Sequence, residues 1–242
     1  MDNFHFSTSH FKNIVFFTGA GMSAESGVPT YRGRGGIWNE YKWEEYACEN
    51  AFKENPDLVL DFHELRRIEA LKCKPHSGHY ILKDIQDKYP NTTVITQNID
   101  GMHQRSGIQN VIELHGSLWR LRCESEGSIY EDLENGKYSN RLCDDGNFRR
   151  PDIIWFGDML DENVIREVNL TISTCDLFIS IGTSALVWPA AGYPQLAKNS
   201  GAFCIEVNPE DTELSPLYDL KVRTTASIGL KNLFRSKEYK FE

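Results

Sequence analysis

The 242-residue sequence lacks several features that mark common protein classes. Its first twelve residues contain neither a basic region nor an apolar stretch, so no secretory signal peptide is expected. None of the six cysteines belongs to a C-x-x-C pair, and Cys175 and Cys204 stand in apolar surroundings typical of a protein core. These features predict a reduced, cytoplasmic protein.

The sequence also lacks an excess of positive charge, with 26 lysines and arginines against 35 acidic residues. The formal net charge is -9 at pH 7, which argues against nucleic acid as the main partner. Residues 177–197 carry no charge, but Gly182, Pro189 and Pro194 interrupt them. We therefore expect a strand, a turn and a short helix there rather than a membrane span. The hydrophobic content of 40% is enough for a packed core.

Short runs rich in β-branched residues alternate with helix-like stretches along the chain. The expected strands are 13–17, 92–96, 111–114, 152–156, 176–181, 202–207 and 220–223. The expected helices among them include 162–174, 189–199 and 230–236. This alternation predicts an α/β fold with a Rossmann-like, doubly wound and mostly parallel sheet covered on both faces.

Two stretches break the alternation. The first is rich in helical patterns and has no strand pattern, and the second is polar and rich in turn signals. We expect these insertions, 38–87 and 117–150, to form a small domain. The Rossmann-like domain would then consist of 1–37, 88–116 and 151–242.

Polar or glycine-rich residues follow five of the expected strands. Ligands bind such sheets beyond the carboxyl ends of the strands. The sequence therefore predicts one composite site there, built from residues 19–32, 97–103, 115–116, 182–184 and Asn208.

The first of these segments, GAGMSA at 19–24, fits the pattern G-x-G-x-x-A directly after a strand. Glycines there allow a backbone to approach a pyrophosphate, although a plain structural turn remains the alternative. Gly27, Pro29 and the glycines of 33–36 interrupt the long helix of an ordinary Rossmann unit, and Glu40 is not at a strand end. Nucleotide binding is indicated, whereas hydride transfer is not.

The second strand is followed by Gln97, Asn98 and Asp100, whose amide and carboxylate groups suit a ribose or a carboxamide. An Asx-turn is the alternative. His115 ends another strand and precedes a glycine, and an ordinary pKa of about 6.5 suits a general base. Six other histidines compete for this role.

The segments Gly182-Thr183-Ser184 and Asn208 repeat the pattern of a strand followed by small polar residues, with a plain turn as the alternative. A serine nucleophile is poorly supported because the sequence has no G-x-S-x-G.

Six segments taken in order resemble the sirtuins, which are NAD-dependent protein lysine deacylases. The segments are GAGMSAESGVPTYR, TQNIDGMHQRSG, ELHGSLWRLRC, WFGDML, IGTSALVWPAAGYP and IEVNPE. The resemblance covers essentially the whole chain. It implies that NAD and an acyl-lysine peptide meet in a cleft between the two domains, and that nicotinamide and O-acyl-ADP-ribose are released.

The resemblance also implies roles for individual residues. The catalytic set is His115 as general base with Asn98 and Asp100. Gln97 and Asn98 contact the nicotinamide ribose, and Ile99 and Asp100 hold the carboxamide. The remaining NAD-binding residues of the first loop are Gly19, Ala20, Gly21, Ala24, Glu25, Tyr31, Arg32 and Trp38. Those of the adenosine end are Gly182, Thr183, Ser184, Asn208, Pro209, Glu210 and Ala226. Trp155, Phe156 and Gly157 pair with the peptide as an added strand.

The chain departs from the family at a zinc site that many sirtuins build from two C-x-x-C pairs. Here Cys123 and Cys143 remain, with Glu126 and Gly146 at the partner positions. Because structural zinc takes four ligands, we expect no structural zinc in this chain. The alternative is a mixed site completed by a nearby carboxylate of Glu126, Asp144 or Asp145.

A second departure concerns the acyl group. Sirtuins that remove succinyl groups carry a Tyr-x-x-Arg pair, and here His63 and Arg66 occupy those positions. A guanidinium binds a carboxylate in a bidentate way, so we expect tolerance of acidic acyl chains, with a solvated Arg66 as the alternative. Arg34 stands where that branch usually has alanine, and the sequence does not explain it.

The expected partners are acylated lysines of proteins, with no nucleic acid or membrane, and the expected state is a monomer. Two other hypotheses about the function remain open. One is a relative that transfers ADP-ribose or hydrolyses NAD, and the other is an NAD-sensing module without activity.

Overall fold

The computed structural model describes residues 10–31, 35–133 and 135–234, and most of its strands form one parallel sheet. The strand order in this six-stranded sheet is β3-β2-β1-β7-β8-β9. The strands are β1 (Ile14–Thr18), β2 (Thr92–Thr96), β3 (Val111–Glu113), β7 (Leu177–Ile181), β8 (Phe203–Val207) and β9 (Leu220–Val222). Every neighbouring pair is parallel, which confirms the doubly wound α/β fold predicted from the sequence.

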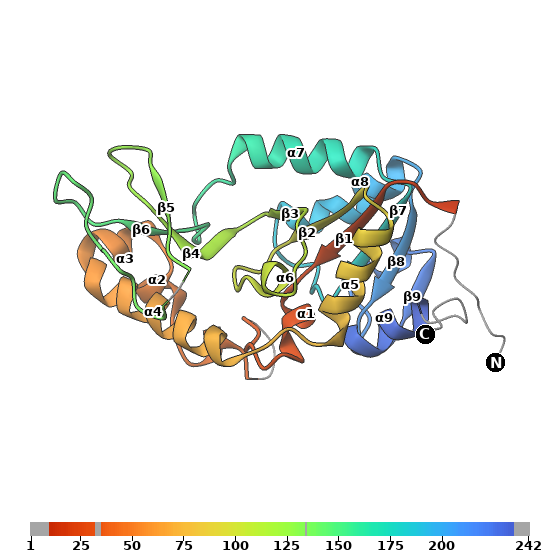
Figure 1. The fold of residues 1–242 in the computed structure, drawn as a ribbon, viewed down its shortest axis with the longest axis horizontal. Helices are drawn as coiled ribbons and strands as arrows, with labels where there is room; N and C mark the ends of the chain where they lie inside the picture. The colour runs from red at the N-terminus through yellow and green to blue at the C-terminus, as the bar shows by residue number, and fades with distance from the viewer. Residues whose placement is uncertain (1–9, 32–34, 134, 235–242) are drawn as a thin grey trace.

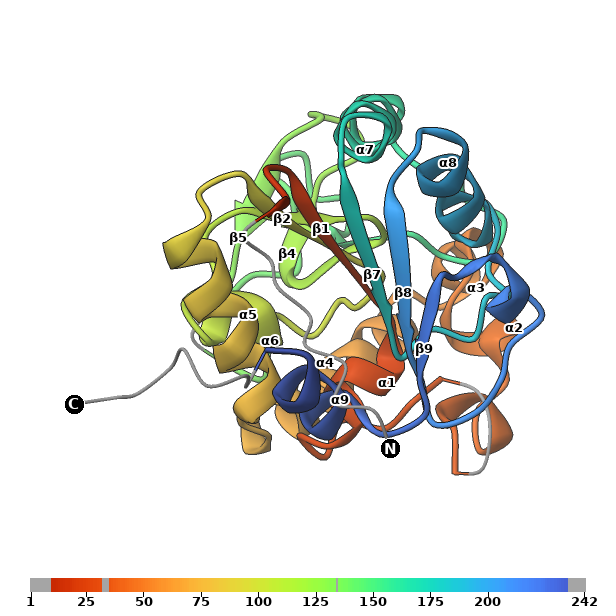
Figure 2. The same cartoon turned by 90° about the vertical axis from the view of Figure 1, so that its right-hand side faces the viewer.

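Helices cover both faces of this sheet. On one face lie α5 (Ser77–Lys88) and α9 (Ala226–Phe234), and on the other lie α7 (Glu162–Ser173) and α8 (Tyr193–Asn199), as Figure 2 shows. Successive side chains of a strand point to opposite faces, so Phe16 packs in the core under α5 and α9 while Phe17 packs under α7 and α8. Both phenylalanines are fully buried, which explains the continuous apolar runs of the central strands.

The two insertions form a second body at the end of the molecule away from β8 and β9 (Figure 1). It contains α2 (Trp43–Tyr46), α3 (Glu49–Glu54) and α4 (Pro56–Lys72), and an antiparallel sheet of order β5-β4-β6. The strands of this sheet are β4 (Gly116–Arg122), β5 (Ile129–Glu131) and β6 (Arg150–Ile153). The long helix α4 starts where the side chain of Asn55 accepts a hydrogen bond from the amide of Leu58, with Pro56 in the first turn.

The structure differs from the expected domain ranges at two places. Helix α5 was expected in the small domain, but Leu82 and Ile85 pack in the core of the large sheet. Strand β6 was expected in the Rossmann-like domain, but it pairs with β4 in the small sheet. The expected strand 152–156 overlaps β6 only at residues 152 and 153, and the sequence pattern does not say which core either element joins.

The remaining helical segments are short: α1 (Ala20–Ala24), α6 (Met102–Arg105), η2 (Ile37–Asn39), η3 (Ala190–Gly192) and η4 (Ser215–Leu217). Among the described residues, none of the helices combines the length and the apolar character needed to cross a bilayer.

Candidate active site

The carboxyl ends of the central strands meet at one edge of the sheet, as the sequence predicted. The Asn98 side chain, just after β2, donates hydrogen bonds to the Gly19 carbonyl oxygen at 2.9 Å and the Ser23 hydroxyl at 3.1 Å. Both of those residues follow β1. Sequence reasoning did not single out Ser23, although it lies within the glycine-rich segment.

Two further side-chain amides tie the neighbouring strand ends together. Gln97 Nε2 donates to the Thr183 hydroxyl at 3.1 Å, and Asn208 Nδ2 donates to the Thr183 carbonyl oxygen at 3.2 Å. Thr183 therefore lies between the ends of β2 and β8, so four strand ends form one connected polar edge.

The glycines after β1 are needed for close packing between two turns. A Cβ atom on Gly19 or Gly21 would lie 2.7 Å from backbone atoms of Gly182. The Gly21 amide also donates to the Gly182 carbonyl oxygen at 2.8 Å. Helix α1 ends after five residues, and Gly27 follows with φ +90°, which confirms the predicted break in the helix.

A small pocket lies beside this turn, between the sheet edge and the insertions. The residues that line it are Ala20, Ser23, Val28, Pro29, Tyr31, Arg66, Ala70, Asn98, Ile99, Asp100 and Leu118. Apolar walls combined with a few hydroxyl, amide and carboxyl groups suit a flat heterocycle that carries an amide. The lining therefore offers hydrogen-bond partners for such a group.

Asp100 is the buried acid of this pocket. Its Oδ1 atom accepts a hydrogen bond from the Met102 amide at 2.9 Å. Burial raises the pKa of the Asp100 carboxyl above its ordinary value, and the Met102 amide opposes that shift in part.

His115 follows β3 and is half-buried. Its Nδ1 atom lies 3.0 Å from the carbonyl oxygen of Gln97. Burial lowers the pKa of His115, and the bond to Gln97 works in the opposite direction. The ring is neutral near pH 7, as a general base requires.

His63 does not lie where an acyl-binding role requires it. It is 2% exposed, its Nδ1 atom lies 2.7 Å from the Val59 carbonyl oxygen, and its Nε2 atom accepts from the Trp155 indole at 3.4 Å. Burial lowers its pKa to about 4. With both nitrogens engaged inside the small domain, His63 cannot take the place of the tyrosine, and that prediction is wrong.

Arg66 lies one turn further along α4 and does line the pocket. Its Nε atom is buried and has no hydrogen-bond partner within the described part of the chain. Tyr31, on the same pocket, has its pKa raised to about 12 by burial, opposed by the nearby Arg66 charge. A fully solvated Arg66 is therefore excluded, whereas Arg32 and Arg34 lie outside the described residues.

The segment Trp155–Gly157 is a turn rather than a free strand edge. The Trp155 carbonyl oxygen accepts from the Asp158 amide at 3.1 Å, and the Phe156 amide donates to the Ala47 carbonyl oxygen at 3.0 Å. Gly157 has φ +93°. The segment is therefore not extended in this structure, and its pairing with a bound peptide stays a prediction.

Glu25 and Ala226, two of the predicted NAD-binding residues, lie close together at the start of α9. The Glu25 carboxylate accepts from the Ser227 amide at 2.8 Å and from the Thr225 hydroxyl at 3.0 Å. It thereby caps the start of α9 and fixes the buried Ala226. This cap explains why α9 begins before residue 230.

The other predicted residues lie around this centre. Trp38 packs beside Tyr31, with ring centroids 5.8 Å apart, and beside Phe156 at 5.7 Å. At the rim of the sheet edge, the exposed residues are Ser184, Pro209 and Glu210. Ala24 ends α1.

Cys123 and Cys143 form a disulfide. Asp145 brings a carboxylate oxygen within 4.8 Å of the two sulfur atoms. Zinc binds cysteine as the thiolate, and two sulfur atoms bonded to each other are not thiolates. The expectation of reduced cysteines is wrong for this pair, whose partners are 20 positions apart and show no local pairing signal.

Comparisons with known proteins identify the family of this chain. Residues 19–189 match the model of the Sir2 family. An NAD-dependent protein deacylase of Aquifex aeolicus (strain VF5) is 42% identical, with 92% of this chain and 94% of that protein aligned. A Sir2 homologue in complex with NAD has a TM-score of 0.85 at 38% identity, covering 92% of this chain and 88% of that one.

A Sir2 variant with a deacetylated p53 peptide and 3'-O-acetyl-ADP-ribose has a TM-score of 0.82 at 32% identity, covering 92% of both chains. Because the family model matches more than half of the sequence and the alignments span nearly all of it, the chain belongs to the Sir2 family.

Proposed function

We infer that this chain is an NAD-dependent protein deacylase. The reaction we propose consumes an acylated lysine, NAD and water, and yields the free lysine, nicotinamide and O-acyl-ADP-ribose. The observation that supports this reaction is that one backbone segment, residues 97–98, both orients His115 and lines the pocket. Gln97 orients His115 through its carbonyl oxygen, and the next residue, Asn98, lines the pocket that fits nicotinamide.

NAD supplies a ribose carbon whose bond to nicotinamide is readily broken. The pocket residues Asn98 and Asp100 would orient the nicotinamide end, and Gly19 to Gly21 would lie beside the phosphates. The buried walls exclude water from the reacting atoms. His115 would accept a proton from a ribose hydroxyl on its Nε2 atom.

The preferred acyl group is a finer part of the proposal. Arg66 brings a permanent positive charge to the pocket, with one buried donor unpaired among the described residues. A carboxylate at the end of a succinyl or glutaryl chain is the kind of group that satisfies such a donor. We propose that the enzyme accepts acidic acyl groups as well as acetyl.

We also propose that the small domain works without structural zinc, because Cys123 and Cys143 are paired with each other. The buried contacts of Arg67 with Asp132 and Asn135 would hold this region together instead. We also propose that the enzyme is a monomer, whereas the reduced state that suggested a cytoplasmic location does not hold for Cys123 and Cys143.

The decisive experiment mixes purified protein, NAD and an acetyl-lysine peptide, and measures products by mass spectrometry. We expect nicotinamide and O-acetyl-ADP-ribose in equal amounts, each dependent on the acylated peptide. Nicotinamide formed equally well without peptide would indicate an NAD hydrolase. ADP-ribose attached to protein would indicate a transferase. No nicotinamide under any condition would leave only an NAD-sensing module.

A further inference from the structure

Strand β4 of the small sheet forms hydrogen bonds to the turn Ile99–Gly101, which forms one wall of the pocket. The Leu118 amide donates to the Ile99 carbonyl oxygen at 3.0 Å. The Trp119 indole Nε1 donates to the Asp100 carbonyl oxygen at 2.8 Å. Two consecutive residues of β4 thus hold two consecutive carbonyls of the turn.

The indole approaches this turn so closely that the next residue must be glycine. A Cβ atom on Gly101 would lie 2.6 Å from Trp119 Nε1, and Gly101 has φ +72°. Trp119 itself is only 6% exposed. The ring therefore fixes both the position and the backbone conformation of the turn.

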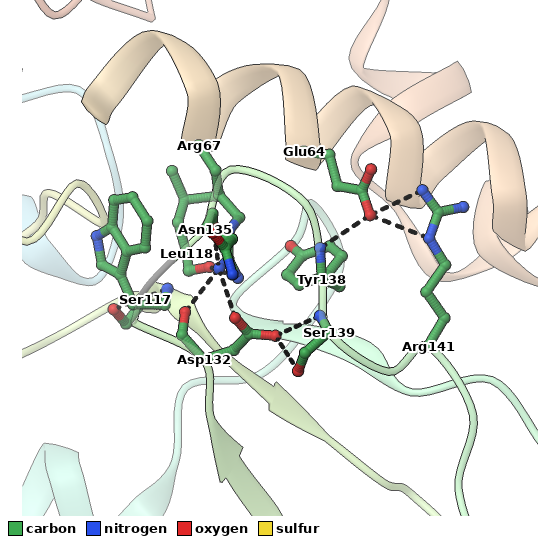
Figure 3. A network of polar contacts seen from close by, with 10 residues as sticks. Glu64, Arg67, Ser117, Leu118, Asp132, Asn135, Tyr138, Ser139 and Arg141 are labelled. Carbon is green, nitrogen blue, oxygen red and sulfur yellow. Dashed lines mark hydrogen bonds and ion pairs between the residues drawn. The ribbon is translucent and has the colours of Figure 1, made fainter. Parts of the chain in front are cut away.

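Arg67, on α4, forms a hydrogen bond to β4. Its fully buried guanidinium donates through Nη1 to the Leu118 carbonyl oxygen at 3.1 Å and through Nη2 to Asp132 Oδ1 at 2.9 Å (Figure 3). The Nη2 atom also donates to the Asn135 carbonyl oxygen at 2.6 Å. The guanidinium carbon lies 5.0 Å from the Trp119 ring centroid, within reach of a cation–π interaction.

The remaining groups of this network face Arg67 from the second insertion. Asp132 Oδ2 accepts from the Ser139 amide at 2.7 Å, and the Tyr138 ring lies 4.5 Å from the guanidinium carbon (Figure 3). The preceding helix residue, Arg66, lines the pocket itself. One turn of α4 therefore connects the interior of the small domain with the pocket.

We propose that Trp119, supported by Arg67, is a positioning residue for the turn Ile99–Gly101, and through it for nicotinamide binding. The proposal rests on the proposed function, because that function gives the turn its ligand. Trp119 does not line the pocket and acts only through Asp100 and Gly101, the two residues that its indole contacts.

The test is Trp119→Phe, which keeps a buried aromatic ring and removes the indole donor. We expect the KM for NAD and the nicotinamide concentration for half-inhibition to rise about tenfold, as the loss of one buried hydrogen bond implies. The KM for the acyl peptide should not change. The matched control is Tyr130→Phe, which removes an aromatic donor from the same small sheet, where Tyr130 bonds Glu126 at 2.9 Å.

A second measurement needs no activity. Hydrogen–deuterium exchange of the amides in 99–106 should be faster in Trp119→Phe than in the wild type and in Tyr130→Phe, without NAD present. Unchanged exchange, or equal rises in the KM values of NAD and peptide, would overturn the positioning role while leaving the deacylase function standing. A wild-type protein that releases no nicotinamide would overturn the proposed function, and the inference with it.

Discussion

The Nδ1 atom of His115 lies 3.0 Å from the carbonyl oxygen of Gln97. A carbonyl oxygen only accepts hydrogen bonds, so Nδ1 carries the hydrogen and Nε2 keeps its lone pair. Because Gln97 directly precedes Asn98, the backbone that orients the base also places a side chain in the pocket. The two parts of the site are therefore set by one short segment after β2.

Replacing His115 by alanine should remove most of the deacylase activity. The expected loss in kcat is about 100-fold or more, which is the usual contribution of a general base. Because the ring of His115 is only half-buried, we expect its removal to leave NAD affinity and the unfolding temperature little changed. Steady-state kinetics and calorimetric NAD titration check this, with the exposed His10→Ala as control. Full activity in His115→Ala would overturn the assignment.

The pH dependence of kcat/KM should report the titration of His115. Burial lowers the pKa of this ring, and only the neutral ring is a base. Activity should therefore be retained through neutral pH and fall as the pH drops below about 6.5, the ordinary histidine value. A midpoint above that value would contradict the structure. The His115→Ala variant should lack this limb of the profile.

Arg66→Met should separate acidic from neutral acyl substrates. The variant keeps the length of the side chain but removes the positive charge from the pocket. We expect kcat/KM for succinyl- and glutaryl-lysine peptides to fall about 10- to 100-fold, as for a lost charge-assisted hydrogen bond, with acetyl-lysine turnover maintained. Arg122→Met serves as control, because Arg122 is the last residue of β4 and does not line the pocket. Unchanged succinyl turnover in Arg66→Met would remove Arg66 from acyl recognition.

The sequence predicts the large sheet and its polar edge well because both depend on local patterns. Apolar runs mark the strands, and Gln97, Asn98 and Thr183 come directly after them. Parallel pairing then brings strand ends together without further information. The interruption of α1 is equally local, since Gly27 cannot continue a helix in its observed conformation.

Other features depend on contacts distant in the sequence. His63 has the spacing of an acyl-binding residue, but its side chain is buried against Val59 and Trp155. The role of Trp119 depends on the approach of β4 to Gly101, and nothing in either segment alone reveals it. Packing of this kind decides which residues of a motif reach the site.

The disulfide between Cys123 and Cys143 should stabilise the small domain without metal. The partners are 20 positions apart, and a cross-link over such a loop contributes about 3 kcal/mol to the free energy of unfolding. A reductant should lower the unfolding temperature of the wild type and leave Cys123→Ser unaffected. Metal analysis of protein purified without chelator should find no zinc, and one zinc per chain would contradict the pairing.

Acid should destabilise the protein through three buried histidines. Burial lowers the pKa of His63 to about 4, of His79 to about 2 and of His103 to about 3. In the unfolded chain these rings titrate near pH 6.5, so below that pH the unfolded state binds more protons than the folded state. Each ring should therefore remove about 1 kcal/mol of unfolding free energy per pH unit once the pH is below 6. Stability should be fully present above pH 7.

Urea unfolding between pH 7 and 5 measures this loss, in a range where most carboxylates stay ionised. His63→Asn keeps a donor toward the Val59 carbonyl oxygen and removes one titrating ring, so its stability should fall less steeply with decreasing pH than that of the wild type. The exposed His10→Asn should follow the wild type. A free energy of unfolding that is constant from pH 7 to 5 would mean that these rings bind protons equally in the folded and unfolded states, and it would contradict the lowered pKa values.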